Sequence, residues 1–240
     1  MRILFFDTET TGNTHEDRIV QLAIKERGVQ TPVLNELFKA PFPIPFESSA
    51  VHHISNKMVA GKPLFQESPR YQEIKELFEN PETIVVAHNS AFDVAMLAAE
   101  GIHPTNVICT YKTVRHIDIE TQFTNYKLQY LRYALDMELD VGAHDAFADV
   151  IVLEKLFEYL LEKMIQGGSN EQEALKEMMR ITHEPAFMRE FSFGKHKGMR
   201  VEEVAKIDPG YLSWLLTEKM KNPIGEEDWI FTLQKYLEKK

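Results

Sequence analysis

The chain has 240 residues, 37 acidic and 27 basic, so its formal net charge is −10. An apolar fraction of 44% excludes wholesale disorder and fits one or two globular domains. No run reaches the about 18 apolar residues of a membrane span, and the N-terminus turns acidic too early for a signal peptide. The single cysteine, Cys109, excludes an internal disulfide framework. We expect a cytoplasmic protein whose net charge, taken alone, argues against a simple polyanion binder.

Short apolar runs predict the strands of the first half of the chain. Residues 2–6 form the first candidate, and 18–25 and 32–39 form two more that would join it in an antiparallel arrangement. Residues 83–87 are continuously apolar, as in a strand buried on both faces, and 106–109 predict a further short strand.

Helical patterns follow these runs. A helix is expected over 68–79, with Ser68 as N-cap and Pro69 as its first residue. Others are expected over 90–100, ended by Gly101, and over 127–135 and 145–164. The apolar stripe of the last helix consists of Val150, Leu153, Phe157, Leu160, Leu161 and Met164.

Residues 166–170, Gln-Gly-Gly-Ser-Asn, interrupt the helical pattern and indicate a linker. We expect a first domain over 1–165, a linker with a helical segment over 166–182, and a C-terminal module over 183–240. The first 165 residues carry 24 acids and 15 bases, a net charge of −9. The predicted fold class is α/β, a mixed sheet flanked by helices, followed by a small α+β domain.

Asp7 and Glu9 come directly after the first apolar run. Residues i and i+2 of a strand point to the same face, so the two carboxylates would project together. Paired carboxylates repel unless a cation lies between them, and such oxygen ligands suit Mg²⁺ or Mn²⁺. The alternative is a solvated strand end.

Asp93 ends the segment 88–93, His-Asn-Ser-Ala-Phe-Asp, which follows the buried strand predicted at 83–87. Ligands of open α/β sheets bind at the carboxyl ends of such strands, which favours a functional Asp93. The alternative is structural, since Ser90 and Asp93 have the spacing of a helix capping box.

His144 and Asp149 lie at the start of the last predicted helix of the first domain. Five residues of an ideal helix rotate about 500°, so the two side chains cannot share a face if both are helical. We therefore expect His144 in the loop before the helix and Asp149 one turn inside it. The alternatives are a helix-entry histidine and a solvated first-turn acid.

Together, the three segments resemble the motifs of the DEDDh exonuclease family, which has a ribonuclease H-like fold. Asp7 and Glu9 match its D-x-E motif, residues 88–93 match H-N-x-x-F-D, and His144 with Asp149 match H-x4-D. The tyrosine variant of this superfamily would need Tyr where this chain has Asp145, so the histidine class is indicated.

This resemblance implies a 3′→5′ exonuclease that uses two Mg²⁺ ions, with Mn²⁺ as a substitute, and releases nucleoside 5′-monophosphates. Asp7, Glu9 and Asp149 would hold the first ion, Asp7 would bridge to the second, and Asp93 would support it. His144 would deprotonate the attacking water, which an imidazole suits at neutral pH.

The resemblance also implies substrate contacts. Residues 50–54 are similar to the family's A-x-H-x-I segment, in which His52 and its neighbour Ile54 would wedge against the terminal nucleotide. The alternative is a turn with two surface histidines. Further substrate contacts are expected from the motif neighbours Thr8, Thr10, Asn89 and Phe92.

The segments 191–200 and 208–215 resemble the C-terminal module of exodeoxyribonuclease X-like proteins. Lys195, Lys197 and Arg200 make the first of them locally basic, and they could hold a phosphate backbone beside the aromatic side chains of Tyr211 and Trp214. Alternatively, the aromatic side chains form a small core and the bases are only solvated. The other histidines, His196 among them, are expected at the surface, and Cys109 in the core.

The expected partner is therefore the 3′ end of DNA, preferably single-stranded, with RNA as a possible substrate. Neither a membrane nor a polymerase partner is indicated. The alternative functions are a proofreading subunit of a polymerase, an RNA-trimming exonuclease, or a non-catalytic nucleic-acid-binding module on the same fold.

Overall fold

The computed structural model describes residues 1–118, 122–139, 146–221 and 226–238. Within them, one mixed sheet has the strand order β3-β2-β1-β4-β5. β1 pairs antiparallel with β2 and parallel with β4, β2 pairs antiparallel with β3, and β4 pairs parallel with β5. The mixed sheet and the antiparallel start are thus confirmed. The strands are β1 (Arg2–Thr10), β2 (Ile19–Glu26), β3 (Leu34–Leu37), β4 (Thr83–Ala87) and β5 (Val107–Cys109).

β1 is longer than the predicted strand over 2–6, because pairing with β2 continues past the apolar run. Asp7 lies opposite Ala23 and Glu9 opposite Gln21, and the register shifts between Glu9 and Thr10. The two carboxylates therefore lie within a strand, on backbone that the neighbouring strand holds in place.

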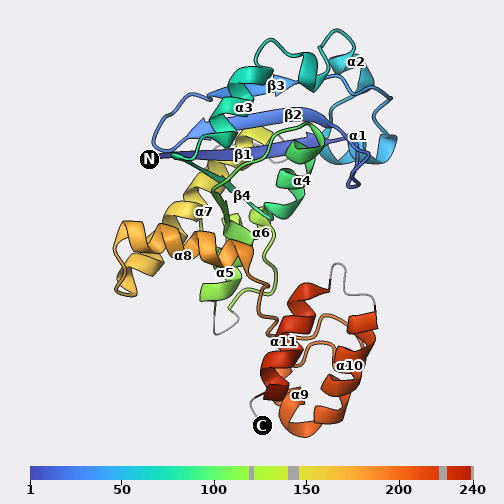
Figure 1. Ribbon diagram of the computed structural model, residues 1–240, viewed down its shortest axis with the longest axis vertical. Helices are drawn as coiled ribbons and strands as arrows, with labels where there is room; N and C mark the ends of the chain where they lie inside the picture. The colour runs from blue at the N-terminus through green and yellow to red at the C-terminus, as the bar shows by residue number, and fades with distance from the viewer. Residues whose placement is uncertain (119–121, 140–145, 222–225, 239–240) are drawn as a thin grey trace.

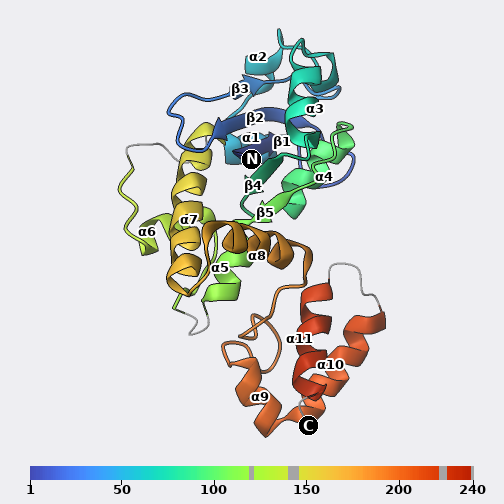
Figure 2. The same ribbon diagram turned by 60° about the vertical axis from the view of Figure 1, so that its left-hand side comes forward.

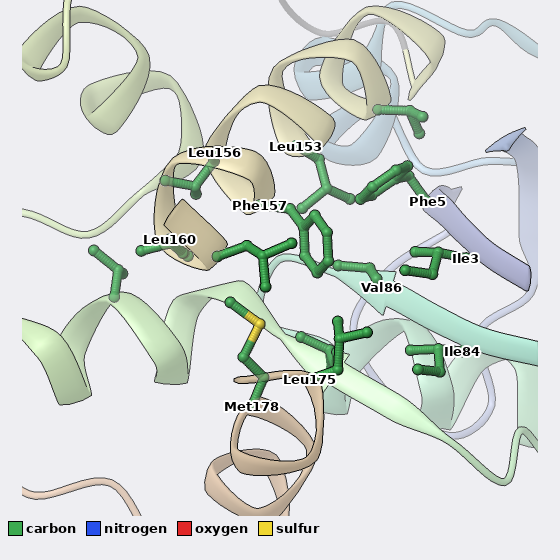
Figure 3. Packing of buried hydrophobic residues seen from close by; sticks show 14 of the residues in the cluster. Ile3, Phe5, Ile84, Val86, Leu153, Leu156, Phe157, Leu160, Leu175 and Met178 are labelled. Atoms are coloured by element: carbon green, nitrogen blue, oxygen red, sulfur yellow. The ribbon is translucent and has the colours of Figure 1, made fainter. Parts of the chain in front are cut away.

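One face of the sheet packs against α7 (Ala146–Gln166) and α8 (Glu171–His183), as Figure 3 shows. Ile3 and Phe5 of β1 contribute to this first core cluster, and the rings of Phe5 and Phe157 meet edge to face at 5.2 Å. Burying each such ring contributes about 1.5–3 kcal/mol. The predicted apolar stripe of the long helix is confirmed, because its residues belong to this cluster.

The opposite face packs against α3 (Tyr71–Glu79) and α4 (Ala91–Ala99). Phe6 of β1 meets Phe78 of α3 edge to face at 4.9 Å in this second core cluster. The prediction that α3 begins at Ser68 was wrong. Ser68 Oγ accepts a hydrogen bond from the Arg70 backbone N–H, so this serine stabilises the preceding turn.

Shorter helices complete the first unit: α1 (Phe46–His52), α2 (Asn56–Val59), η1 (Phe65–Glu67), α5 (Thr110–Ile117) and α6 (Leu128–Ala134). Ser48 of α1 donates a hydrogen bond to the Thr11 carbonyl at 2.6 Å, which fastens α1 beside the end of β1. α6 packs on α7, and α5 packs on both α7 and α8.

The C-terminal residues form a separate body in Figures 1 and 2. Its helices α9 (Val201–Ile207), α10 (Pro209–Lys221) and α11 (Glu227–Glu238) surround an aromatic core in which Phe191 stacks on Trp229 at 5.0 Å. The predicted β component of this domain is limited, in the described residues, to one bridge between Glu190 and Arg200.

The segment predicted as a linker, 166–182, contains a tight turn and then α8. Asn170 caps α8 and forms a reciprocal capping box with Glu173. Leu175 and Met178 of α8 belong to the first core cluster (Figure 3). We propose that the first domain extends to about residue 183. Within the described part of the chain, no helix is long and apolar enough to cross a membrane.

Candidate active site

Three carboxylates meet at the end of β1. Asp7, Glu9 and Asp149, which we call the acidic cluster, each offer an oxygen that lies within 4.8 Å of the other two. Strand alternation places Asp7 and Glu9 on the face of Phe5, which α7 covers, and Asp149 is in the first turn of α7. The pleat of one strand and the start of one helix thus build the cluster.

The acidic cluster has the donor chemistry of a divalent cation site. All three side chains are partly exposed, so a cation can reach them from solvent. Three carboxylates at this distance repel one another, and a cation between them relieves the repulsion. Carboxylate oxygens are the ligands that Mg²⁺ and Mn²⁺ prefer, so these residues fit the metal that the sequence predicts.

Gln129 of α6 is a further residue of this site. Its side-chain amide donates a hydrogen bond to Asp149 Oδ1. Sequence reasoning missed it because the pattern over 127–135 predicts only a helix and assigns no function to its residues. No local signal distinguishes Gln129, since its contact depends on how α6 packs on α7.

Asp93 lies across β1 from the acidic cluster. Its Oδ1 accepts hydrogen bonds from the Thr8 backbone N–H at 3.2 Å and from Thr8 Oγ1 at 2.7 Å. The side chain is 4% exposed, and this burial raises the pKa of Asp93 to about 7. The capping-box alternative was wrong, since Ser90 makes no side-chain cap bond and Asp93 instead joins α4 to β1.

His144 lies outside the described residues, so its place beside Asp149 stays a prediction. A different histidine, His88, follows β4 and is held on both sides. Its Nε2 contacts the Tyr126 carbonyl at 2.8 Å and its Nδ1 contacts Thr110 Oγ1 at 2.9 Å. Burial lowers the pKa of His88 to about 4. It is therefore neutral at pH 7 and donates from Nε2, since a carbonyl only accepts.

Two of the four substrate contacts predicted near the motifs, Thr8 and Thr10, are buried. Thr8 bonds to Asp93, and Thr10 Oγ1 donates to the Gly12 carbonyl at 2.5 Å. Phe92 packs against the second core cluster, whereas Asn89 is exposed and has a positive φ of 64°. Contact of these four residues with a substrate stays a prediction.

His52 is buried rather than at the surface. Its Nδ1 accepts a hydrogen bond from the Ile54 backbone N–H at 3.0 Å, while its buried Nε2 finds no hydrogen-bond partner in the described part of the chain. Burial lowers the pKa of His52. The surface-histidine alternative was therefore wrong for His52, although His53 is exposed. Ile54 lies in a small core with Val59.

The basic loop, residues 191–200, is partly neutralised by its own module. Lys195 Nζ forms an ion pair with Asp208 Oδ2 at 2.6 Å, and His196 Nε2 contacts the same oxygen at 3.0 Å. The hydrogen bond from Lys195 and, to a smaller extent, that from His196 lower the pKa of Asp208 to about 2. The expectation that His196 lies at the surface was wrong, because its side chain is only 13% exposed. Lys197 and Arg200 are exposed.

The backbone conformation and the close packing at position 194 of the basic loop explain why a glycine stands there. Its φ of +70° is unfavourable for other residues, and a Cβ there would lie 2.5 Å from the Tyr211 hydroxyl. Tyr211 packs on Phe191 in the module's core, whereas its neighbour Trp214 is 55% exposed. The core alternative therefore holds for Tyr211, while Trp214 faces solvent.

The mixed sheet, with an acidic cluster where β1 meets the start of α7, defines a nuclease of ribonuclease H-like fold. A family model described as Exonuclease matches residues 4–157, and one described as Exodeoxyribonuclease X-like C-terminal matches residues 191–218. The chain therefore belongs to the exonuclease family and carries the C-terminal module of its exodeoxyribonuclease X-like members.

Curated relatives agree with this assignment. The chain is 31% identical over 214 residues to exodeoxyribonuclease 10 of Escherichia coli (strain K12). This match covers 87% of the chain and 88% of the relative. It is 33% identical over 165 residues to the DNA polymerase III subunit epsilon of Treponema pallidum (strain Nichols). This match covers 63% of the chain and 73% of the relative.

Solved structures show the same fold. Exonuclease X in complex with 5′ overhanging duplex DNA superposes with a TM-score of 0.58 and 24% identity, covering 75% of this chain and 99% of that one. Escherichia coli exonuclease I in complex with a dT13 oligonucleotide superposes with a TM-score of 0.54 and 19% identity. The match covers 66% of this chain and 40% of that one.

Proposed function

We propose that the chain is a metal-dependent 3′→5′ exonuclease that removes nucleotides from the 3′ end of DNA and releases nucleoside 5′-monophosphates. The acidic cluster is the observation that carries this proposal, because a bound cation would relieve the repulsion among its three carboxylates. The relatives support it, since a relative whose match covers 87% of the chain is named an exodeoxyribonuclease.

In this proposal, Asp7, Glu9 and Asp149 hold divalent cations, with Mg²⁺ as the natural ion and Mn²⁺ as a substitute. When bound, the cations would polarise the scissile phosphate and favour ionisation of the attacking water. Gln129 fixes the orientation of Asp149 through its hydrogen bond. The residues of the acidic cluster thus bind and orient, and α7 and β1 keep them in place.

Asp93 and His144 have the two other proposed roles. Both hydrogen bonds from Thr8 end on Asp93 Oδ1, so Oδ2 is the oxygen that Asp93 would offer to a second cation. His144 accepts the proton of the attacking water, a task for which a pKa near 6.5 is suited.

Substrate binding is proposed for two groups of residues. Near the cluster, contacts with the terminal nucleotide come from Thr8, Thr10, His52, Ile54, Asn89 and Phe92. In the C-terminal module, Lys195, Lys197 and Arg200 bind the phosphate backbone. Single-stranded or frayed ends are the preferred substrates, and DNA repair or turnover in the cytoplasm is the proposed setting.

A proofreading subunit is the second candidate, favoured by the match to a polymerase subunit. That match covers 63% of the chain, however, while residues 191–218 match the exodeoxyribonuclease X-like module. We therefore favour an exonuclease that acts without a polymerase.

The proposal is tested by incubating the full chain with 5′-labelled single-stranded DNA or RNA of the same sequence, with Mg²⁺ or with EDTA. We expect stepwise shortening from the 3′ end of DNA and release of nucleoside 5′-monophosphates, none of it in EDTA. Asp7→Asn is the inactive control. Absence of release with both Mg²⁺ and Mn²⁺ would exclude the exonuclease, and faster release from RNA would favour the RNA-trimming alternative.

A further inference from the structure

A cavity of about 330 Å³ lies where the C-terminal module joins the first domain. One wall comes from α5 and the segment after it, through Tyr111, Arg115 and Tyr126, and the other comes from the chain entering the C-terminal module, through Phe187 and Arg189. This volume is within the range of sites that hold a small organic ligand. The cavity thus combines aromatic rings with two guanidinium groups and needs both domains to exist.

The two arginines of the cavity have no carboxylate partner among the described residues. Arg115 lies over the rings of Tyr111 and Tyr126, at 5.4 Å from each centroid, and donates to the Tyr111 hydroxyl at 2.8 Å and to Met188 Sδ at 2.9 Å. Sulfur is a weak acceptor, so the positive charge of Arg115 is not compensated by these bonds.

Arg189 is similarly placed. It donates from Nη2 to the His116 carbonyl at 3.2 Å and lies over the Phe187 ring, and its buried Nε has no hydrogen-bond partner among the residues that the structure describes. By contrast, Arg27, Arg70 and Arg180 all form ion pairs with glutamates. A buried guanidinium donor without a partner is costly, and an anion that enters the cavity would satisfy it.

The cavity lies at the same edge of the sheet as the acidic cluster. β1, β4 and β5 are parallel neighbours, so their carboxyl ends meet at one edge, and β5 lies two strands, about 10 Å, from β1. Tyr111 comes two residues after β5. His88, which follows β4, contacts both Tyr111, with ring centroids 5.8 Å apart, and the Tyr126 carbonyl.

We propose that this cavity binds the single-stranded DNA on the 5′ side of the bond that is cut at the acidic cluster. The guanidinium groups of Arg115 and Arg189 bind a backbone phosphate, and a base stacks on the aromatic wall, as in other single-strand sites. Glu190 also lines the cavity but is exposed, so water screens its negative charge. The inference rests on the proposed exonuclease function and adds a second, remote binding point to it.

The test separates DNA binding from cleavage. Anisotropy of 5′-labelled oligothymidylates of two and ten nucleotides is measured in EDTA with the full chain, Arg189→Ala and Arg189→Lys. We expect Arg189→Ala to weaken binding of the longer oligonucleotide about 5- to 10-fold and to reduce its salt slope by about one phosphate contact. The dinucleotide should be unaffected, and Arg189→Lys should lie between. Arg180→Ala removes an exposed arginine charge outside the cavity and should bind as the wild type does.

Cleavage supplies an independent control. Hydrolysis of the p-nitrophenyl ester of thymidine 5′-monophosphate with Mn²⁺ needs only the acidic cluster and should be unchanged in Arg189→Ala. Equal loss with both oligonucleotides, or no loss with either, would overturn the cavity proposal. If the wild type cleaves nothing, the exonuclease proposal fails, while the binding experiment in EDTA still reports on the cavity.

Arg189→Ala could also loosen the junction, since Arg189 bonds to the His116 carbonyl. A second measurement on the wild type avoids this difficulty. Oligonucleotides carrying a single 5-iododeoxyuridine at successive positions are photo-crosslinked to the full chain, and the crosslinked peptides are identified by mass spectrometry. We expect positions a few nucleotides from the 3′ end to crosslink at Tyr126 or Phe187. Crosslinks confined to other regions would contradict the proposal.

Discussion

The acidic cluster and the basic loop are the two charged regions of the molecule that the sequence ties to function, and the fold treats them in opposite ways. In the acidic cluster, one strand and one helix bring three like charges within 4.8 Å of one another. In the basic loop, Lys195 is paired with Asp208, while Lys197 and Arg200 remain exposed.

This difference indicates in which of the two regions a substitution should have a large effect. Like charges that rigid elements hold together need a counter-ion, so removing one of them should change metal binding and chemistry strongly. Bases that are paired or solvated contribute screened attraction, so removing them should change affinity by a small factor. Net charge conceals this, since the total of −10 includes the acids of the proposed metal site.

Neutralising the acidic cluster should have the largest effect. Asp7→Asn and Asp149→Asn should each lower kcat by about 10³-fold or more, because transition-state stabilisation by the cation is lost. Nucleotide release measures this, and circular dichroism should show an intact fold. Glu162→Gln removes an exposed acid from the same helix and is the matched control. Near-normal activity of either aspartate variant would show that the cluster is not the catalytic site.

His144→Ala should lower kcat by about 10²- to 10⁴-fold, the range for loss of a general base. Since His144 is proposed as a base and not as a ligand, calorimetric titration with Mn²⁺ should give the wild-type affinity. The acidic limb of the pH–rate profile should also disappear. Loss of Mn²⁺ binding together with activity would instead identify His144 as a ligand.

Gln129→Met should weaken Mn²⁺ binding by about 10-fold, because Asp149 loses the hydrogen bond that orients it. Methionine keeps the length of the side chain but cannot donate. Calorimetry and the Mn²⁺ dependence of nucleotide release measure the effect, which high Mn²⁺ should overcome. If the loss persists at saturating Mn²⁺, Gln129 does not act through the metal site.

His88 should act on stability in acid rather than on catalysis. In the unfolded chain His88 has a pKa near 6.5, whereas burial lowers its pKa in the folded chain to about 4. The free energy of unfolding should therefore decrease as the pH is lowered from about 6.5 to about 4, by up to about 1.4 kcal/mol per pH unit. Urea unfolding of His88→Gln should show a flatter profile, and exposed His103→Gln should keep the wild-type slope. An unchanged slope in His88→Gln would contradict this assignment.

Charge removal in the basic loop should have the smallest effect. Lys197→Ala should weaken single-stranded DNA binding about 2- to 5-fold and lower the salt slope by about one. Lys195→Ala should do less, because Lys195 already pairs with Asp208. Anisotropy over a range of salt concentrations measures both, with Lys206→Ala of α9 as the control. A salt slope that stays unchanged would leave the loop as a solvated surface.

Elements that depend on local patterns could be predicted. β4 is the continuously apolar run over 83–87, and α7 follows its apolar stripe, because burial alone decides both. The pairing of Asp7 with Glu9 on one face follows from the period of a strand. Their approach to Asp149 came from the family resemblance and is matched by the geometry.

Features that depend on tertiary contacts could not be predicted. β1 extends through polar residues because β2 pairs with them, and α8 joins the first core although a glycine pair precedes it. Asp93 bonds to Thr8 on the opposite face of β1, and Gln129 reaches Asp149 only through helix packing. His196 has no sequence signal because its partner, Asp208, lies beyond an intervening helix.

Calorimetric titration of Mn²⁺ into the full chain, compared with Asp149→Asn, tests the central claim most directly. The claim is that the ends of β1 and α7 together form a divalent cation site. We predict saturable Mn²⁺ binding by the wild type, competed by Mg²⁺ and weakened at least about 10-fold in Asp149→Asn. Equal Mn²⁺ binding by both proteins, or no binding by the wild type, would contradict the account.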